Sequence, residues 1–485
     1  MKENSALSVA IIGAGPAGIA AGHELLAQGF KDFTIFEKES AAGGTWHMHS
    51  YPGLACDVWA HAYTFSYAPN PNFTENFVGF AEIAAYLQRC ATEFGLDPHI
   101  KLNTRILSAK WQPEGHWLIQ TDDGKENTFD VIINAMGNQH TPVIPQLEAM
   151  ESFTGHSWHS TEWNHDVDLS GKNIVVVGSA AAAVQVVPEL AKVAKQLTVL
   201  QRSPNWILPR GKKPYSQMKI RAFNRWPWLV RLLRWGQRKL MAIMHKGALL
   251  GAKQMDTFEN MGRKYINKAI EDPALRAALT PSSRFGCKRP LVADDFYPAL
   301  NQPNVDLVAE GAKGLYPTGI VTASGQQIEA DVIIYCTGYR VMDFDRIEVV
   351  GKDERNMAEE LAEAPEAYKG SAVPGYPNYF FAVGPNALVL SAPYFNSAEV
   401  NVAYIVNLLA EMRSQGTTSI EVKADICRAY NDDLQQKIPL FSWGSGECTT
   451  YYETASGHHP FLFPGNFKSY VTERENSSLQ DYQTI

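Results

Sequence analysis

The hydrophobic positions of this sequence gather into short runs separated by glycine turns and by helices with one polar face. The first run, Leu7 to Ile12, is rich in β-forming residues and leads directly into a glycine-rich turn. An apolar helix follows to Leu26, Gly29 ends it, and a second apolar run occupies residues 33–36. A strand, a glycine turn, a helix and a second strand form the opening of a doubly wound nucleotide-binding fold.

A second unit of the same kind lies near the middle of the chain. It predicts a strand over 173–177, a helix from about residue 180 to 195, and a strand over 197–200. The apolar segments at 129–137 and 330–338 are strand-like, and each closes one unit. The pattern therefore predicts an α/β protein with two Rossmann-like dinucleotide-binding domains.

The positions of these units divide the 485 residues into segments. We expect residues 1–140 to form the first segment of the first domain, residues 141–165 to form a linker, and residues 166–338 to form the second domain, with a helical insertion at 211–285. Residues 339–485 are expected to return to the first domain and to include a C-terminal loop. The polar last dozen residues are expected to form a frayed tail.

Composition and charge narrow the setting. Apolar residues make up 45% of the chain and charged residues 19%, as in ordinary folded proteins. A net charge of −8 disfavours nucleic acid as a partner. No apolar run reaches the roughly 18 residues of a membrane-spanning helix. The six cysteines form no CxxC pair, so we expect a cytoplasmic protein with neither a zinc knuckle nor a redox dithiol.

The turn after the first strand carries candidate cofactor-binding residues. It reads GAGPAG, a full GxGxxG, and the next strand ends in an acidic residue. Glycines permit a tight turn and close approach to a pyrophosphate, the helix N-terminus favours phosphate, and a carboxylate accepts from ribose hydroxyls. The pattern predicts a dinucleotide site that contains Gly13, Gly15, Pro16, Ala17, Gly18 and Glu37.

The central unit departs from this pattern. Gly178 is followed by Ala180 and Ala183 where glycines are expected, and Ala180 adds a methyl group where the backbone meets a pyrophosphate. The next strand ends in Gln201 and Arg202, and an arginine there suits the 2′-phosphate of NADP(H). The alternative is a structural Rossmann unit with a surface arginine. Two dinucleotide sites in one chain suggest FAD in the first and NADPH in the second.

Three further motifs are more specific. Residues 43–57 read GGTWHMHSYPGLACD, residues 153–164 read FTGHSWHSTEWN, and residues 285–289 read FGCKR. Together they resemble the fingerprints of the type I Baeyer-Villiger monooxygenases, a class B flavoprotein monooxygenase family, over residues 9 to about 465. The matching residues in the first two motifs are Trp46, Tyr51, Pro52, Gly53, Asp57, Phe153, Gly155, His159 and Trp163.

The resemblance implies an FAD- and NADPH-dependent enzyme that inserts one oxygen atom of O2 beside a ketone carbonyl. The product is an ester or lactone, formed through a C4a-peroxyflavin. It implies that Arg289 stands over the flavin, and Asp57 can pair with it and fix its position. A permanently charged guanidinium stabilises the peroxide anion and the tetrahedral adduct. His159 is expected to be a pivot for domain rotation.

The same resemblance extends the set of cofactor-binding residues. We expect the first cofactor to meet Gly44, Thr45, Trp46, Asp57 and Tyr63. We expect NADP to meet Gly178, Ser179, Ala180, Gln185, Arg202, Ser203 and Lys288, with Lys288 at a phosphate. Tyr451 and Phe463 stand where the family has tryptophans, in a loop that is mobile in relatives, so the sequence leaves substrate range open.

Two rival functions compete with this interpretation. A flavin monooxygenase that oxidises nitrogen or sulfur needs a hydroperoxide rather than a peroxide anion, so Arg289 argues against it. The rival of a different class is a flavin-binding protein whose NADPH turnover is impaired by Ala180 and Ala183. The sequence indicates no oligomeric state, and His47 and His49 have no obvious third ligand, so no metal is assigned.

Residues 211–253 form a basic segment in an acidic protein. The basic segment contains eleven Lys or Arg and no Asp or Glu, so the rest of the chain carries a formal charge of −19. Trp226, Trp228 and Trp235 lie among these cations. One interpretation is a peripheral membrane contact, as basic amphipathic helices with tryptophans make. The alternative, which the sequence favours, is a helical insertion whose apolar face packs on its own protein.

Overall fold

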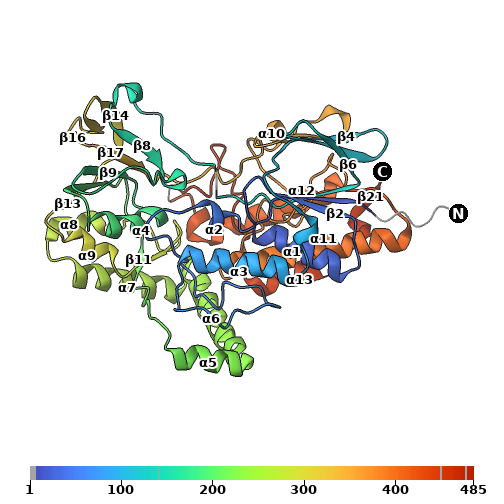
Figure 1. Ribbon diagram of the computed structural model, residues 1–485, viewed down its shortest axis with the longest axis horizontal. Coiled ribbons are helices and arrows are strands. Elements are labelled where there is room, and N and C mark those ends of the chain that lie inside the picture. Colours follow the sequence, from blue (N-terminus) through green and yellow to red (C-terminus); the bar gives the residue numbers. More distant parts are fainter. Residues whose placement is uncertain (1–6, 140, 448–449, 476–477) are drawn as a thin grey trace.

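A computed structural model describes residues 7–139, 141–447, 450–475 and 478–485 (Figure 1). Two five-stranded sheets organise the chain into halves, which we name the first lobe (right in Figure 1) and the second lobe (left). The strand order is β19-β7-β1-β2-β3 in the first lobe and β13-β10-β9-β17-β8 in the second. All strand pairings within these two sheets are parallel.

The first lobe is assembled from both ends of the chain. Its sheet consists of β1 (Val9–Ile12), β2 (Phe33–Phe36), β3 (Ile100–Lys101), β7 (Val131–Asn134) and β19 (Tyr379–Phe381). Its other elements are α1 (Pro16–Ala27), α2 (Thr45–Met48), α3 (Phe80–Glu93), β4 (Ile106–Gln112), β5 (His116–Thr121), β6 (Glu126–Phe129), β18 (Glu348–Val350), α10 (Met357–Glu360), α11 (Tyr394–Gln415), β20 (Ile420–Val422), α12 (Ala424–Lys437), α13 (Phe467–Glu475) and β21 (Tyr482–Thr484). Strand β19 pairs with β7, so the C-terminal part completes a sheet begun at the N-terminus.

Both faces of the first sheet are covered, which explains why β1 shows no alternation of apolar and polar residues. Val9 and Ile11 belong to the core formed with α1 and α11. Ala10 and Ile12 belong to the core on the opposite face, where Trp117 of the β18-β4-β5-β6 sheet is fully buried. The carboxyl ends of β1 and β7 therefore open onto a site walled on both sides.

The second lobe repeats this plan. Its sheet consists of β8 (His156–His159), β9 (Asn173–Val177), β10 (Gln196–Leu200), β13 (Val305–Val308) and β17 (Val332–Tyr335). Its other elements are α4 (Ala181–Leu190), β11 (Ile207–Leu208), β12 (Leu291–Val292), α9 (Phe296–Leu300), β14 (Ala312–Tyr316), β15 (Gly319–Thr322) and β16 (Gln327–Glu329). The edge strand β8 comes from the range expected to be a linker.

Four helices lie between β11 and β12, in the range predicted as a helical insertion. They are α5 (Gln217–Arg225), α6 (Pro227–Gly247), α7 (Lys253–Ala269) and α8 (Pro273–Leu279). Helix α5 and one end of α6 project from the body of the molecule (Figure 1). Among the described residues, no helix is both long and apolar enough to cross a membrane.

The structure confirms some of the element bounds predicted from the sequence and corrects others. The strands predicted over 33–36 and 173–177 have these bounds, whereas α4 ends at Leu190 rather than near 195. The expected frayed tail is wrong: β21 pairs with β20, and buried Tyr482 places its hydroxyl 2.8 Å from that of Tyr404. Cys287 is disulfide-bonded, which the spacing of the cysteines did not indicate.

Candidate active site at the junction of the two lobes

The turn between β1 and α1 has the form that a pyrophosphate requires. Gly13 has φ +103°, and a Cβ there would lie 2.9 Å from the carbonyl oxygen of Ala135. A Cβ on Gly18 would lie 1.8 Å from the Gly13 carbonyl oxygen. No side chain caps α1, so its first N–H groups are free for an anion. The residues present therefore fit a dinucleotide.

Glu37 lies beside this turn, as predicted. It is buried, and its Oε2 accepts a hydrogen bond of 2.7 Å from the N–H of Ala14, inside the glycine motif. Its Oε1 accepts one of 3.0 Å from the N–H of Glu39. Each carboxylate oxygen can accept more than one hydrogen bond, so Glu37 keeps capacity for a ribose.

The fingerprint segment 43–57 continues the first site. A Cβ on Gly44, at φ +54°, would lie 3.0 Å from the Cα of Gly15, so the starts of α2 and α1 meet closely. Trp46 donates from its indole to the Tyr63 hydroxyl at 3.3 Å. The structure thus brings together two of the residues expected at the flavin.

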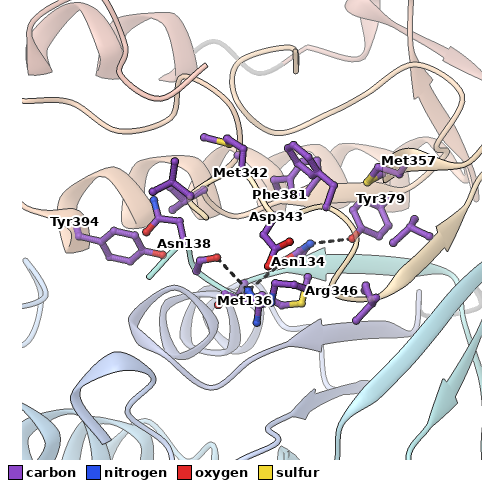
Figure 2. A pocket seen from close by; sticks show the side chains of 18 residues that line it. Asn134, Met136, Asn138, Met342, Asp343, Arg346, Met357, Tyr379, Phe381 and Tyr394 are labelled. Carbon is purple, nitrogen blue, oxygen red and sulfur yellow. Dashed lines mark hydrogen bonds between the residues drawn. The ribbon is translucent and has the colours of Figure 1, made fainter. Parts of the chain in front are cut away.

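A pocket lies where β7 and β19 end (Figure 2). Asn134 donates to the Tyr379 hydroxyl at 2.9 Å on its wall. Arg346 lines the same pocket, and burial together with the neighbouring Arg105 lowers its pKa to about 10. Arg346 belongs to no sequence motif and reaches the pocket only through the tertiary fold, so the sequence does not predict it.

The second lobe reproduces the turn with fewer glycines. Gly178 has φ +111°, and a Cβ there would lie 2.5 Å from the Cys336 carbonyl oxygen. Ala180 has φ −92° and ψ −160°, close to the −75° and −172° of Gly15 at the corresponding place. This extended conformation is open to any residue, so the backbone at Ala180 does not require glycine. No side chain caps α4, which leaves its N-terminal N–H groups for an anion.

Cations gather beyond β10, where a 2′-phosphate would lie. Lys288 donates from Nζ to Ser203 Oγ, and burial lowers the pKa of Lys288, with the positive charge of Arg202 adding to the effect. Repulsion between two cations is relieved by an anion, so this group fits NADP(H). The side chain of Gln201 is not part of this cationic group, because its amide donates to the Ala278 carbonyl oxygen at 3.0 Å.

The Tyr-Pro-Gly step of the fingerprint joins the lobes. Tyr51 donates to Gln185 Oε1 at 2.9 Å, and Gln185 Nε2 donates to the Ala55 carbonyl oxygen at 2.8 Å. A Cβ on Gly53, at φ +79°, would lie 2.2 Å from the Gln185 carbonyl oxygen. Only glycine allows the loop this close to α4.

Asp57 and Arg289 meet at the same junction, one from each lobe. Arg289 Nε donates to Asp57 Oδ2 at 3.1 Å, and Nη2 lies 3.1 and 3.0 Å from Oδ1 and Oδ2. The two side chains are 42% and 28% exposed for Arg289 and Asp57. The carboxylate raises the pKa of Arg289, so the guanidinium stays charged at the junction between the lobes.

Two groups of aromatic rings lie near this junction. The rings of Tyr451 and buried Tyr452 lie 4.4 Å apart with a tilt of 57°, and both tyrosines help to raise the pKa of Arg289. Phe463 packs against Tyr470 in a separate core. At the crossing between lobes, Tyr339 stacks on His49, and His159 meets the same ring edge-on, with centroids 5.8 and 5.7 Å away.

Comparison with known proteins defines the class. The flavin-binding monooxygenase-like family matches residues 6–356, and this chain belongs to that family. The chain is 37% identical over 460 residues to a Baeyer-Villiger monooxygenase of Pseudomonas aeruginosa, covering 94% of this chain and 87% of the relative. It is 35% identical over 483 residues to one of Streptomyces coelicolor, covering 98% and 92%. The resemblance drawn from the fingerprints is confirmed.

Solved structures agree with the fold. A steroid monooxygenase bound to NADP matches with a TM-score of 0.86 and 27% identity over 99% of both chains. A closed cyclohexanone monooxygenase matches with a TM-score of 0.88 over 99% of both chains. Its 23% identity supports the fold alone. The predicted α/β class with two Rossmann-like domains is therefore confirmed.

Proposed function

We propose that this protein is an FAD- and NADPH-dependent Baeyer-Villiger monooxygenase that converts a ketone to an ester or lactone. One atom of O2 enters beside the carbonyl, the other leaves as water, and NADPH supplies two electrons. The observation that carries the proposal is the Asp57–Arg289 pair between a flavin-type and an NADP-type site. Bound flavin supplies the activation of O2; the chain supplies placement and charge.

Each group of residues has a proposed task. The turn of Gly13 to Gly18, with Glu37 and the Gly44 to Trp46 step, holds the FAD, and Tyr63 lies against it. Ser179, Arg202, Ser203 and Lys288 hold NADP, while Gln185 positions α4. Arg289 stabilises negative charge on the reacting oxygen, because its guanidinium cannot lose its proton.

The domain division follows from the same proposal. Residues 1–140 and 339–485 form the FAD domain, and residues 166–338 form the NADP domain. The completion of the first sheet by β19 supports this division. The substrate is a small-molecule ketone, and a peripheral membrane contact through the basic segment would favour an apolar long-chain or polycyclic one.

A paired assay tests the reaction. The FAD-loaded protein is mixed with NADPH, O2, a cyclic ketone and a thioether, and products are separated by gas chromatography. Lactone formation is expected, and exclusive sulfoxide formation would contradict the proposal in favour of heteroatom oxidation. Stopped-flow bleaching of the flavin is measured in parallel; no reduction at saturating NADPH would show a flavin-binding protein without NADPH turnover.

A further inference from the structure

Helix α6 turns its large apolar side chains away from the protein. Trp228, Leu232 and Trp235 are 59%, 55% and 60% exposed, and Ile243 is also exposed. The spacing of four, three and eight residues places them on one face of the helix. We name these four residues the outward stripe. At 1.5 Å per residue it is about 22 Å long.

The opposite face of α6 is buried and carries several polar side chains. Arg234 is 6% exposed, and Gln237 and His245 are buried beside it. Arg234 Nη1 donates to the carbonyl oxygen of Thr64 at 2.7 Å and to Thr64 Oγ1 at 2.6 Å. Thr64 belongs to the first lobe. Val230 and Met241 are buried on the same face. A surface helix normally buries its apolar face, whereas α6 buries a mixed face and leaves its largest apolar side chains exposed.

This anchoring fixes which way the outward stripe faces. If α6 rolled over to bury its tryptophans, the carbonyl and hydroxyl oxygens of Thr64 would lose the charged donor that Arg234 Nη1 supplies. The expectation that the apolar face of the basic segment packs on its own protein holds for Val230 and Met241 and is wrong for the outward stripe.

The charge around the outward stripe has one sign. Lys239 and Lys246 lie on the same face of α6 as the outward stripe, and Lys239 Nζ is 5.6 Å from the centre of the Trp235 ring. The basic segment contains no acidic residue. Helix α5 and the adjoining end of α6 also project from the body (Figure 1), and the four side chains of the stripe are exposed.

We propose that the outward stripe of α6 docks on an anionic membrane surface, with the helix lying in the plane of the lipid headgroups. Tryptophans and aliphatic side chains enter the interface while lysines reach phosphate groups. A second copy of the chain docked symmetrically would place like charges together. Leucine and isoleucine offer no ring for stacking on bases, which disfavours nucleic acid.

Vesicle binding tests the proposal with the FAD-loaded protein. Vesicles of phosphatidylcholine alone and with 30% phosphatidylglycerol are sedimented at 0.1 M salt. Wild type is expected to partition onto the anionic vesicles with a blue shift of tryptophan emission. The variant Trp228→Gln/Leu232→Gln/Trp235→Gln should partition at least tenfold less. The variant Arg231→Gln/Lys239→Gln/Lys246→Gln should lose its preference for anionic lipid.

Matched controls keep the result specific. Leu102→Gln/Leu107→Gln/Val193→Gln removes exposed apolar side chains outside the basic segment and should bind vesicles as wild type does. All variants should oxidise a water-soluble ketone at the wild-type rate, which separates docking from the chemistry. Absent binding by wild type, equal binding by the stripe variant, a dimer that this variant dissolves without vesicle binding, or binding to a single-stranded oligonucleotide alone would each overturn the proposal.

Discussion

Arg289 combines a fixed position with unused donors. Asp57 takes hydrogen bonds from Nε and Nη2, while Nη1 makes none to any residue that the structure describes. A lysine would reach Asp57 with a single point charge and lose the two-donor geometry. The position of the charge, as well as its sign, therefore depends on arginine.

Arg289→Lys should leave FAD binding and flavin reduction by NADPH within a few-fold of wild type. Ester formation should fall by about 10²- to 10³-fold, the effect of losing one preorganised charge-stabilising group. Reduction is measured by stopped flow and product by chromatography. Arg284→Lys alters an exposed arginine of the same loop, paired with Asp256 and Glu259, and should behave as wild type. Normal ester yield from Arg289→Lys would remove its proposed role.

Lys288 gives the NADPH site a pH dependence. Burial and the nearby Arg202 lower the pKa of Lys288 below its usual 10.5, so it loses its charge earlier as pH rises. The KM for NADPH should therefore increase toward alkaline pH, and Lys288→Arg should flatten that profile because arginine stays charged. The KM for NADH, which lacks the phosphate, is the control. Parallel profiles for wild type and Lys288→Arg would contradict this assignment.

At the scale of elements, the Tyr-Pro-Gly loop determines the position of α4 relative to the first lobe. Gly53 is the point of contact, where the loop approaches the backbone of Gln185. Gly53→Ala should lower stability by about 1–3 kcal/mol, from strain at positive φ and the clash, and should raise the KM for NADPH by displacing α4. Thermal unfolding of the FAD-loaded protein and steady-state kinetics measure the two effects.

Gly236→Ala provides the matched control. Gly236 lies inside α6, and a Cβ there meets nothing within 4 Å. Alanine favours a helix by up to about 1 kcal/mol over glycine, so the melting temperature should stay equal or rise. A Gly53→Ala protein as stable as this control would show that the loop can move away from α4.

Helix α6 shows how far a pattern of residues predicts an element. Its apolar and polar positions predict a helix with two unlike faces, and the structure has that helix. The pattern does not say which face meets protein, because the acceptors of Arg234 come from residues 61–65, about 170 positions earlier. The strand β21 was missed for a similar reason: its partner β20 supplies the pairing that its polar sequence does not indicate.

At the scale of the whole molecule, two histidines at the crossing between lobes couple stability to pH. Burial lowers the pKa of His49 and of His159 to about 4, from 6.5. Between pH 6.5 and 4 the unfolded chain binds protons that the native protein does not. Their contribution is therefore complete above pH 6.5 and is lost as pH falls toward 4, by up to about 3 kcal/mol for each histidine.

The melting temperature should thus fall steeply with acid, and less steeply in His49→Gln. Differential scanning calorimetry of the FAD-loaded protein from pH 7 to pH 4.5 gives both slopes. His156→Gln changes an exposed histidine of β8 and should retain the wild-type slope. Equal slopes for wild type and His49→Gln would show that His49 is protonated without cost in the native protein.

The sequence predicts those residues of the candidate site that belong to a motif within one continuous segment of the chain. The glycine turns and Glu37 were found from local spacing, since each serves a local turn or strand end. The Lys288–Arg289 step was found from the resemblance of residues 285–289 to a family motif. Arg346 and the Gly53 contact with α4 depend on segments that meet only after both lobes have formed. No local pattern reports such contacts.

The late arrival of β19 has a consequence for synthesis. The second sheet is built from residues 156–335, but the first sheet lacks an edge strand until residue 381 has left the ribosome. The second lobe should therefore become protease-resistant on a nascent chain before the first. Until β19 emerges, the open edge of β7 is available to other strands, so chaperone dependence should concentrate in that interval.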